Sequence, residues 1–107
     1  MEKKRLLETI PLENSKNGNN CIEAEVYYSK GGADYFSGGT RPRGYYVSVT
    51  PVCRNGTSVR FTAFSGIARF LLPTSRYTDK QFETAVELGK GAAPELVKQV
   101  LAKEQAA

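Results

Sequence analysis

The chain has 107 residues and a formal net charge of +4, with 40% hydrophobic and 24% charged residues. These values are ordinary for a single folded domain and exclude a chain that is disordered throughout. No segment approaches the roughly 18 apolar residues of a membrane-spanning helix, and the first 20 residues lack the apolar run of a secretory signal, so we expect a cytoplasmic protein without a membrane partner.

The first 44 residues contain one ambiguous element, one predicted strand and one glycine-rich segment. Four apolar residues near the start fit either a short strand or a short helix: Leu6, Leu7, Ile10 and Leu12. Residues 14–20 form a polar linker, so residues 1–20 can be a flexible N-terminal segment of the one domain, 1–107. Residues 22–28 alternate apolar and polar side chains with the period of a half-buried strand. Residues 31–44 contain five glycines, which predicts a loop or a loose edge hairpin.

A hairpin is predicted next, because Asn55-Gly56 separates two alternating segments, 45–51 and 57–64. A two-residue loop would set polar positions of one strand against apolar positions of the other. A three-residue loop over residues 54–56 instead pairs like with like: Val49 with Phe61 and Val47 with Ala63. On the opposite face this register sets the following residues opposite one another: Tyr46 and Phe64, Ser48 and Thr62, Thr50 and Arg60.

From Gly66 onwards the apolar spacing becomes helical. A short helix is predicted to end before Pro73, because three apolar residues recur at helical spacing: Ile67, Phe70 and Leu71. A second helix begins after Thr78, which forms a capping box with Gln81, and it ends at Gly89. Its buried stripe is predicted to consist of Phe82, Ala85 and Val86, with Tyr77 packed against Phe82.

A last helix opens with Pro94 at its first position. Its buried stripe is predicted to be Leu96, Val97, Val100 and Leu101. Strands therefore come first and helices last. This order predicts an α+β domain with an antiparallel sheet of about four strands followed by C-terminal helices.

The positive charge is concentrated in the middle of the chain. Between Asp34 and Asp79 there are 44 residues without an acidic side chain. They include no lysine but six arginines: Arg41, Arg43, Arg54, Arg60, Arg69 and Arg76. Eight aromatic residues are interleaved: Tyr35, Phe36, Tyr45, Tyr46, Phe61, Phe64, Phe70 and Tyr77. Guanidinium groups bind phosphate through two parallel donors, so this segment is typical of an anion-binding surface, with nucleic acid the commonest partner.

The outer face of the predicted hairpin is the candidate binding surface. Tyr46 and Phe64, with Tyr27 from the preceding strand, are expected to form exposed rings flanked by Arg60. Rings and guanidinium groups on a strand surface bind single-stranded nucleic acid by stacking on its bases. The alternative is that the C-terminal helices cover this face and the rings belong to the core, because exposed aromatic strands are rare.

Arg41 and Arg43 lie in the glycine-rich segment 31–44, where they can clamp phosphates close to the backbone. The segment lacks a Gly-Lys-Ser/Thr ending, which excludes a P-loop. The alternative is a plain flexible hairpin tip whose arginines keep it soluble.

Catalysis has little support in the sequence. Histidine is absent, which removes the usual general base and the commonest zinc ligand. Cys21 and Cys53 are too far apart for a metal site, and we expect free thiols, although a disulfide between them is possible. Glu23 and Glu25 point to one face and fit a solvated strand. We expect a protein that is not an enzyme and has no metal or cofactor.

Three segments resemble small uncharacterised proteins carried on bacterial mobile elements. They are Gly31-Gly32-Ala33-Asp34-Tyr35-Phe36, Arg43-Gly44-Tyr45-Tyr46-Val47-Ser48-Val49-Thr50-Pro51-Val52 and Phe61-Thr62-Ala63-Phe64-Ser65-Gly66. This resemblance spans residues 31–66 and implies no activity, cofactor or site residue. In outline, an aromatic and basic sheet followed by helices is similar to the single-strand-binding coactivator and Whirly domains, although no diagnostic motif of either is present.

Two functions follow as hypotheses. The first is a small module that binds single-stranded DNA or RNA through Tyr46, Phe64, Arg60, Arg41, Arg43 and Tyr27. The second is a protein-interaction or homodimerisation module, in which the same rings meet another protein or a second copy of the chain.

Overall fold

The elements follow the predicted order, with the sheet first and a helix last. The computed structural model describes residues 3–13, 15, 17–33, 39–60 and 66–105. Within these ranges there are seven strands and one helix: β1 (Lys4–Pro11), β2 (Cys21–Ser29), β3 (Gly32–Ala33), β4 (Thr40–Arg41), β5 (Gly44–Asn55), β6 (Ser58–Arg60), β7 (Ile67–Pro73) and α1 (Asp79–Gln105). The predicted α+β class is confirmed, with one C-terminal helix in place of several.

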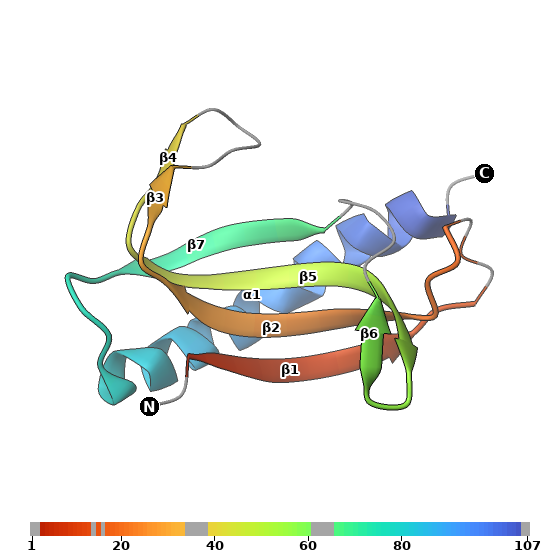
Figure 1. Cartoon of the computed structure of the whole chain (residues 1–107), viewed down its shortest axis with the longest axis horizontal. Helices are drawn as coiled ribbons and strands as arrows, with labels where there is room; N and C mark the ends of the chain where they lie inside the picture. The colour runs from red at the N-terminus through yellow and green to blue at the C-terminus, as the bar shows by residue number, and fades with distance from the viewer. Residues whose placement is uncertain (1–2, 14, 16, 34–38, 61–65, 106–107) are drawn as a thin grey trace.

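The main sheet is antiparallel and is built around β5. β1 pairs with β2, β2 pairs with β5, and β5 pairs along its first half with β7 (Figure 1). The last residues of β5 pair with β6 instead. At the other end of β5, β3 and β4 form a small hairpin that projects from the sheet. Two alternatives that the sequence left open are thus decided. Residues 4–11 form a strand and not a helix, and the glycine-rich segment 31–44 contains a hairpin.

The base of this small hairpin requires a glycine. Gly31 adopts a φ of +79°, which L side chains rarely adopt. A Cβ atom at this position would also lie 2.6 Å from the carbonyl oxygen of Arg41. The hairpin can therefore leave the sheet at this point only because residue 31 has no side chain.

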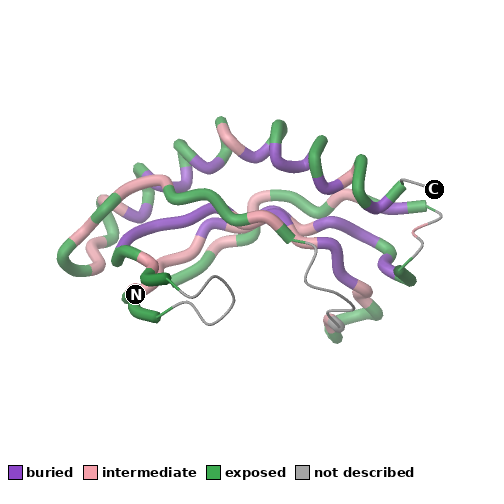
Figure 2. The backbone as a smooth tube through the Cα atoms, turned by 90° about the horizontal axis from the view of Figure 1, so that it is seen from above, coloured by how far each residue is buried: buried purple, intermediate pink, exposed green. Residues whose placement is uncertain are grey.

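The helix α1 crosses one face of the sheet (Figure 2). Its 27 residues span about 40 Å at 1.5 Å per residue. Alternate side chains of the two central strands point toward it and are buried: Ile22, Ala24, Val26, Tyr45, Val47 and Val49. They pack against the inner side of the helix: Phe82, Ala85, Val86, Ala93, Leu96, Val97 and Val100. Fully burying such a side chain contributes about 1.5–3 kcal/mol, so this layer accounts for most of the favourable burial.

The predicted start of the helix is confirmed. The Thr78 hydroxyl accepts a hydrogen bond from the Gln81 N–H at 3.1 Å, and the ring centroids of Tyr77 and Phe82 lie 5.8 Å apart. The Thr78 N–H donates to the hydroxyl of Tyr45 at 3.0 Å. A residue of the sheet therefore replaces half of the predicted capping box, and this ties the helix start to β5.

The prediction of two separate C-terminal helices is wrong, because α1 continues through Gly89 and Pro94. Gly89 is buried, and a Cβ atom there would lie 2.4 Å from Cγ2 of Val26. The glycine allows the helix to approach the sheet closely and does not end it. Pro94 cannot donate a hydrogen bond to the Lys90 carbonyl, yet the buried stripes on both sides of it face the same sheet. No helix among the described residues is long and apolar enough to cross a bilayer.

The predicted short helix over residues 66–72 is also wrong, because this segment is strand β7. Ile67 and Leu71 pack against the core, whereas Phe70 lies on the other face against Tyr46. An irregularity in the pairing opposite Tyr45 and Tyr46 allows Leu71 and Leu72 to pack against the core together. The spacing that suggested a helix is thus the spacing of a strand with one bulge.

The predicted hairpin register is wrong as well. Asn55 pairs with Ser58, so the chain reverses over the two residues Gly56 and Thr57 rather than over residues 54–56. The positions on β5 are paired as follows: Tyr46 with Phe70, Val47 with Arg69, Ser48 with Ala68, Val49 with Ile67, and Cys53 with Arg60. The predicted partners Phe61, Thr62, Ala63 and Phe64 lie outside the described residues. β7 occupies the edge of β5 at which the sequence predicts the second strand of the hairpin. Its apolar side chains Ile67, Leu71 and Leu72 pack against the core in place of the predicted partners.

The polar linker before β2 is held by a buried carboxylate at the end of the helix. Glu104 is buried, and its oxygens accept hydrogen bonds from the side chains of Ser15, Asn17 and Asn19 at 2.5, 3.2 and 3.3 Å. A buried charge is tolerated only when it is hydrogen-bonded. These three contacts therefore fasten the linker to the last turn of α1.

Candidate functional site

The face of the sheet that α1 does not cover is the candidate functional site, and we call it the open face. Its side chains alternate with the core positions along each strand. Pairing across the sheet sets them in rows. The first row contains Lys4, Tyr27, Tyr46 and Phe70, from β1, β2, β5 and β7, and we call it the ring row. The second row, two residues further along, contains Leu6, Glu25, Ser48 and Ala68.

Three aromatic rings of the ring row are in contact. The rings of Tyr27 and Tyr46 stack with centroids 5.5 Å apart and an angle of 15° between their planes. The ring of Phe70 meets Tyr46 edge-on with centroids 5.2 Å apart. Of the three, Phe70 has the most accessible surface, with 39% of the residue exposed.

Arg41 from β4 reaches this row from the small hairpin. Its guanidinium carbon lies 5.1 Å from the centroid of Tyr46, and its Nη1 donates a hydrogen bond to the Tyr27 hydroxyl at 3.1 Å. A guanidinium over an aromatic face is held by attraction to the ring electrons. The structure therefore brings together three of the residues that the sequence singled out, Tyr27, Tyr46 and Arg41.

The expectation that Tyr46 is an exposed ring is wrong, since only 5% of the residue is accessible. Its hydroxyl donates to the Pro42 carbonyl at 2.6 Å, and its ring is enclosed by Tyr27, Phe70 and Arg41. The alternative prediction, burial beneath the C-terminal helices, is also wrong. Tyr46 is buried on the open face by its neighbours in the row and by the small hairpin.

Burial also determines the protonation of the two tyrosines. Burial raises the pKa of Tyr27 and of Tyr46, and in both cases the positive charge of Arg41 opposes the rise. Both phenols are therefore protonated at neutral pH. The Tyr46 hydroxyl donates to the Pro42 carbonyl, and the Tyr27 hydroxyl accepts from Arg41. The ring row carries its positive charge on Lys4 and Arg41 without a compensating phenolate.

Among the described side chains of the other predicted site residues, that of Arg43 does not join the ring row. Arg43 is exposed and donates to the backbone carbonyls of Lys30 at 3.3 Å and Ser75 at 2.7 Å. It thus ties the end of β2 to the loop before the helix. Arg60 pairs through its backbone with Cys53 in β6, and Phe64 lies outside the described residues.

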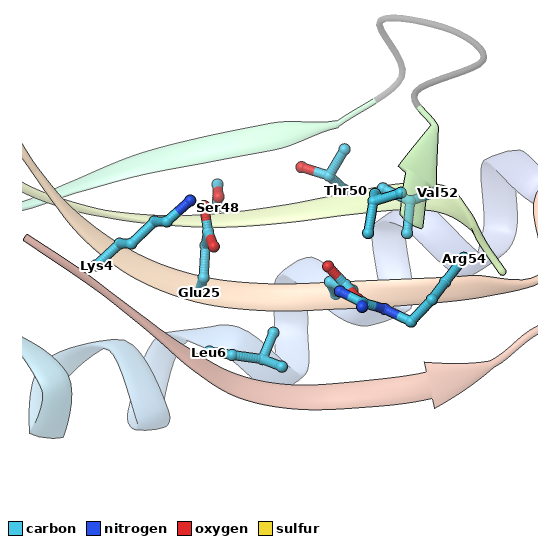
Figure 3. Close-up of a pocket in the computed structure, with 9 residues that line it drawn as sticks. Lys4, Leu6, Glu25, Ser48, Thr50, Val52 and Arg54 are labelled. Atoms are coloured by element: carbon cyan, nitrogen blue, oxygen red, sulfur yellow. The ribbon is translucent and has the colours of Figure 1, made fainter. Parts of the chain in front are cut away.

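Next to the ring row the open face is hollowed into a pocket of about 440 Å³ (Figure 3). Its wall combines four charged, two hydroxyl and three apolar side chains: Lys4, Leu6, Glu23, Glu25, Ser48, Thr50, Val52, Arg54 and Val59. This volume lies within the range of small-molecule sites. A pocket of this composition can hold one flat polar group.

One ion pair closes the β6 end of the pocket. Arg54 approaches Glu23 with its Nε and Nη2 atoms 2.6 and 2.5 Å from the same carboxylate oxygen. The Arg54 backbone is held as well, because its N–H donates to the Asn20 side chain at 2.8 Å. Arg54 thus neutralises Glu23 and is fixed in place.

Sequence reasoning missed two parts of this site. The apolar spacing of residues 67–71 predicts a helix, and a helix does not place the Phe70 ring on the sheet. The sequence predicts Arg54 in a loop and Glu23 and Glu25 on a solvated strand face, and neither prediction points to a pocket between them. The alternation along β2 places both glutamates on one face and is the one sequence signal for this pocket. The residues opposite the glutamates follow only from the register between β2 and β5.

The described residues give no sign of a metal site, because no group of three or more histidine, cysteine or acidic residues among them could hold an ion. Burial, followed by the charge of Glu23, raises the pKa of the Cys21 thiol, so this cysteine is protonated at neutral pH. The chain was also compared with known proteins. A scan against protein-family models and searches of curated proteins and of solved structures found no match.

Proposed function

We propose that the open face binds single-stranded DNA or RNA, with bases stacked at the ring row and phosphates held by Arg41 and Lys4. The observation that carries this proposal is the ring row itself, in which three rings in contact, with Lys4 at one end and Arg41 over the central ring, lie on a sheet face that the helix does not cover. A binding module of this kind needs no catalytic group. A cytoplasmic location, expected from the sequence, would give it access to such strands.

Phe70 is the platform for a base in this proposal. The residue is 39% exposed, and its ring rests against Tyr46. Tyr46 is itself held by Tyr27 and Arg41. A ring that is already fixed loses little conformational entropy when a base stacks on it. Each stacked base contributes about 1–3 kcal/mol with little preference for sequence.

Two cations accompany the rings. Lys4 is exposed on β1 opposite Tyr27, and Arg41 approaches from the small hairpin. Each phosphate neutralised on a single strand contributes about −0.7 to the slope of log K against log salt concentration. Two contacts therefore predict a slope of about −1.4.

A titration of a fluorescent oligothymidylate of about 12 nucleotides tests the proposal, since single-strand sites cover about 4–16 nucleotides. We expect the affinity to fall about sevenfold between about 50 and about 200 mM salt. Absence of binding at the lower salt concentration, or binding that does not respond to salt, rejects the proposal.

A protein partner or a second copy of the chain is the second candidate. Two apolar residues at opposite edges of the open face are exposed, Leu6 at 49% and Phe70 at 39%. Within the described ranges β7 bonds to β5 alone, so its outer edge can accept another strand. Light scattering on the purified protein separates the candidates, because a stable dimer that ignores oligonucleotides supports this one.

A further inference from the structure

The two carboxylates in the pocket of the open face differ in their partners. Glu23 is paired with Arg54. Glu25, by contrast, has no hydrogen bond or ion pair to any residue that the structure describes. Figure 3 shows its side chain rising from β2 into the pocket, with Lys4 entering from β1. Glu25 therefore presents two acceptor oxygens to whatever occupies the pocket.

The chemistry of the wall selects against an anion at this point. A phosphate inside the pocket would lie close to the carboxylate of Glu25, and charges of like sign at such distances are unfavourable. A neutral group with two adjacent N–H donors is the complement of a free carboxylate, because both oxygens can then accept in parallel.

Among the nucleobases, guanine alone offers two adjacent donors on its pairing edge, the N1–H and the 2-amino group. Adenine and cytosine place one amino group beside a ring nitrogen whose lone pair would face the carboxylate. Thymine and uracil flank one N–H with two carbonyls. The guanine O6, next to its two donors, is an acceptor, and the Ser48 hydroxyl is a donor on the same wall.

The pocket also suits the shape of a base and its distance from the ring row. Leu6 and Val59 supply apolar surface for the faces of the ring. Glu25 is one row from the ring row, about 7 Å along β2, and two strands from Phe70, about 10 Å across the sheet. A base stacked on Phe70 is therefore about 12 Å from Glu25, and a nearby nucleotide of the same strand can place its base in the pocket.

We propose that this pocket recognises one guanine of the bound strand through the carboxylate of Glu25, an inference that rests on the proposed function. The wild-type protein should bind an oligothymidylate with one central deoxyguanosine at least about fivefold more tightly than oligothymidylate alone, since a bidentate contact to a base discriminates to this degree. One central deoxyadenosine or deoxycytidine should give no such gain.

Variants of the base and of the protein identify the contact. Deoxyinosine lacks the 2-amino group and should lose most of the gain, whereas 7-deazaguanine keeps the pairing edge and should retain it. Glu25→Gln should abolish the preference for guanine. Glu87→Gln, the same change on an exposed helix position, is the matched control and should keep the preference.

The outcomes separate this inference from the proposed function. Equal affinity of the wild-type protein for strands with and without guanine overturns the inference, while salt-dependent binding of oligothymidylate keeps the proposed function. A preference that survives Glu25→Gln, or is unchanged by deoxyinosine, also overturns it. Failure of every strand to bind rejects both. A thermal unfolding curve shows whether Glu25→Gln is folded, and the deoxyinosine comparison uses the wild-type protein alone.

Discussion

Tyr27 and Tyr46 lie directly opposite each other on the two central strands, and their rings stack 5.5 Å apart on the face away from the helix. Such a pair contributes about 0.5–1.5 kcal/mol beyond the area it buries. Tyr46 is almost inaccessible, so it cannot offer its ring to a ligand without a rearrangement. Its role is to hold Phe70 and Arg41 in place.

Tyr46→Phe tests this supporting role. The change removes the hydrogen bond to the Pro42 carbonyl but keeps the ring, so the free energy of unfolding should fall by about 1 kcal/mol. Tyr46→Ala removes the ring and should cost about 3–5 kcal/mol. Urea denaturation measures both. Loss of oligonucleotide binding in Tyr46→Phe at unchanged stability would mean that the tyrosine contacts the ligand directly.

Phe70→Ala tests the proposed base platform. We expect an affinity for single-stranded oligonucleotides at least about fivefold weaker, because one stacked base is lost. Leu88→Ala is the matched control, since Leu88 is 45% exposed on the helix, whereas Phe70 is 39% exposed on the open face. Fluorescence titration of both variants gives the comparison. Equal affinities in the two variants would remove Phe70 from the site.

Two glycines of the helix should respond in opposite directions to alanine. Gly89→Ala places a methyl group 2.4 Å from Val26 Cγ2, and this overpacking should reduce the free energy of unfolding by about 1–3 kcal/mol. A methyl group at Gly91 would meet no side chain or neighbouring element within 4 Å among the described residues, so Gly91→Ala should stabilise the helix by about 0.5–1 kcal/mol. Thermal unfolding of both variants checks the pair. Stabilisation by Gly89→Ala would contradict the close contact between helix and sheet.

The contact between Arg5 of β1 and Glu83 of α1 should make stability depend on pH. The hydrogen bond from Arg5 lowers the pKa of Glu83 below its ordinary value of 4.5. The folded state therefore binds this proton less tightly than the unfolded state, so the contact stabilises the protein above the ordinary pKa. Its contribution is lost as the pH falls through the lowered pKa. The contact is exposed, and we expect the effect to be small.

Unfolding midpoints in urea measure this effect. The difference between the wild-type protein and Glu83→Gln should be largest near neutral pH and should shrink as the pH falls below 4.5. Glu87→Gln serves as the control, because Glu87 contacts only its helix neighbour Lys90 among the described residues. A difference that is constant with pH would show that Arg5 does not act through the charge of Glu83.

Local pattern was sufficient for several parts of the fold. The alternation of Ile22, Ala24 and Val26 predicted β2 and its buried face. The start of α1 was predicted from Thr78 and Gln81, because a helix cap depends on residues within one turn. The order of these elements was enough for the α+β class.

The candidate site was predicted only in part. Tyr27, Tyr46 and Arg41 were singled out and do lie together, because alternation places both tyrosines on one face. Their arrangement was not predictable, since the pairing of β5 with β7 decides that Phe70, and not Phe64, lies beside Tyr46. The pocket depends in the same way on residues from four strands.

The amino-acid sequence by itself therefore determined the class of the fold, the buried face of β2, the start of the helix and the concentration of arginine and aromatic residues. Each of these depends on neighbours within a few positions of the chain. Only the tertiary structure decided that residues 67–73 form a strand, that the helix continues through Gly89, and that Tyr46 is covered. The reason is that each of these outcomes is set by contact with a segment distant in the chain, and such contacts can override local spacing.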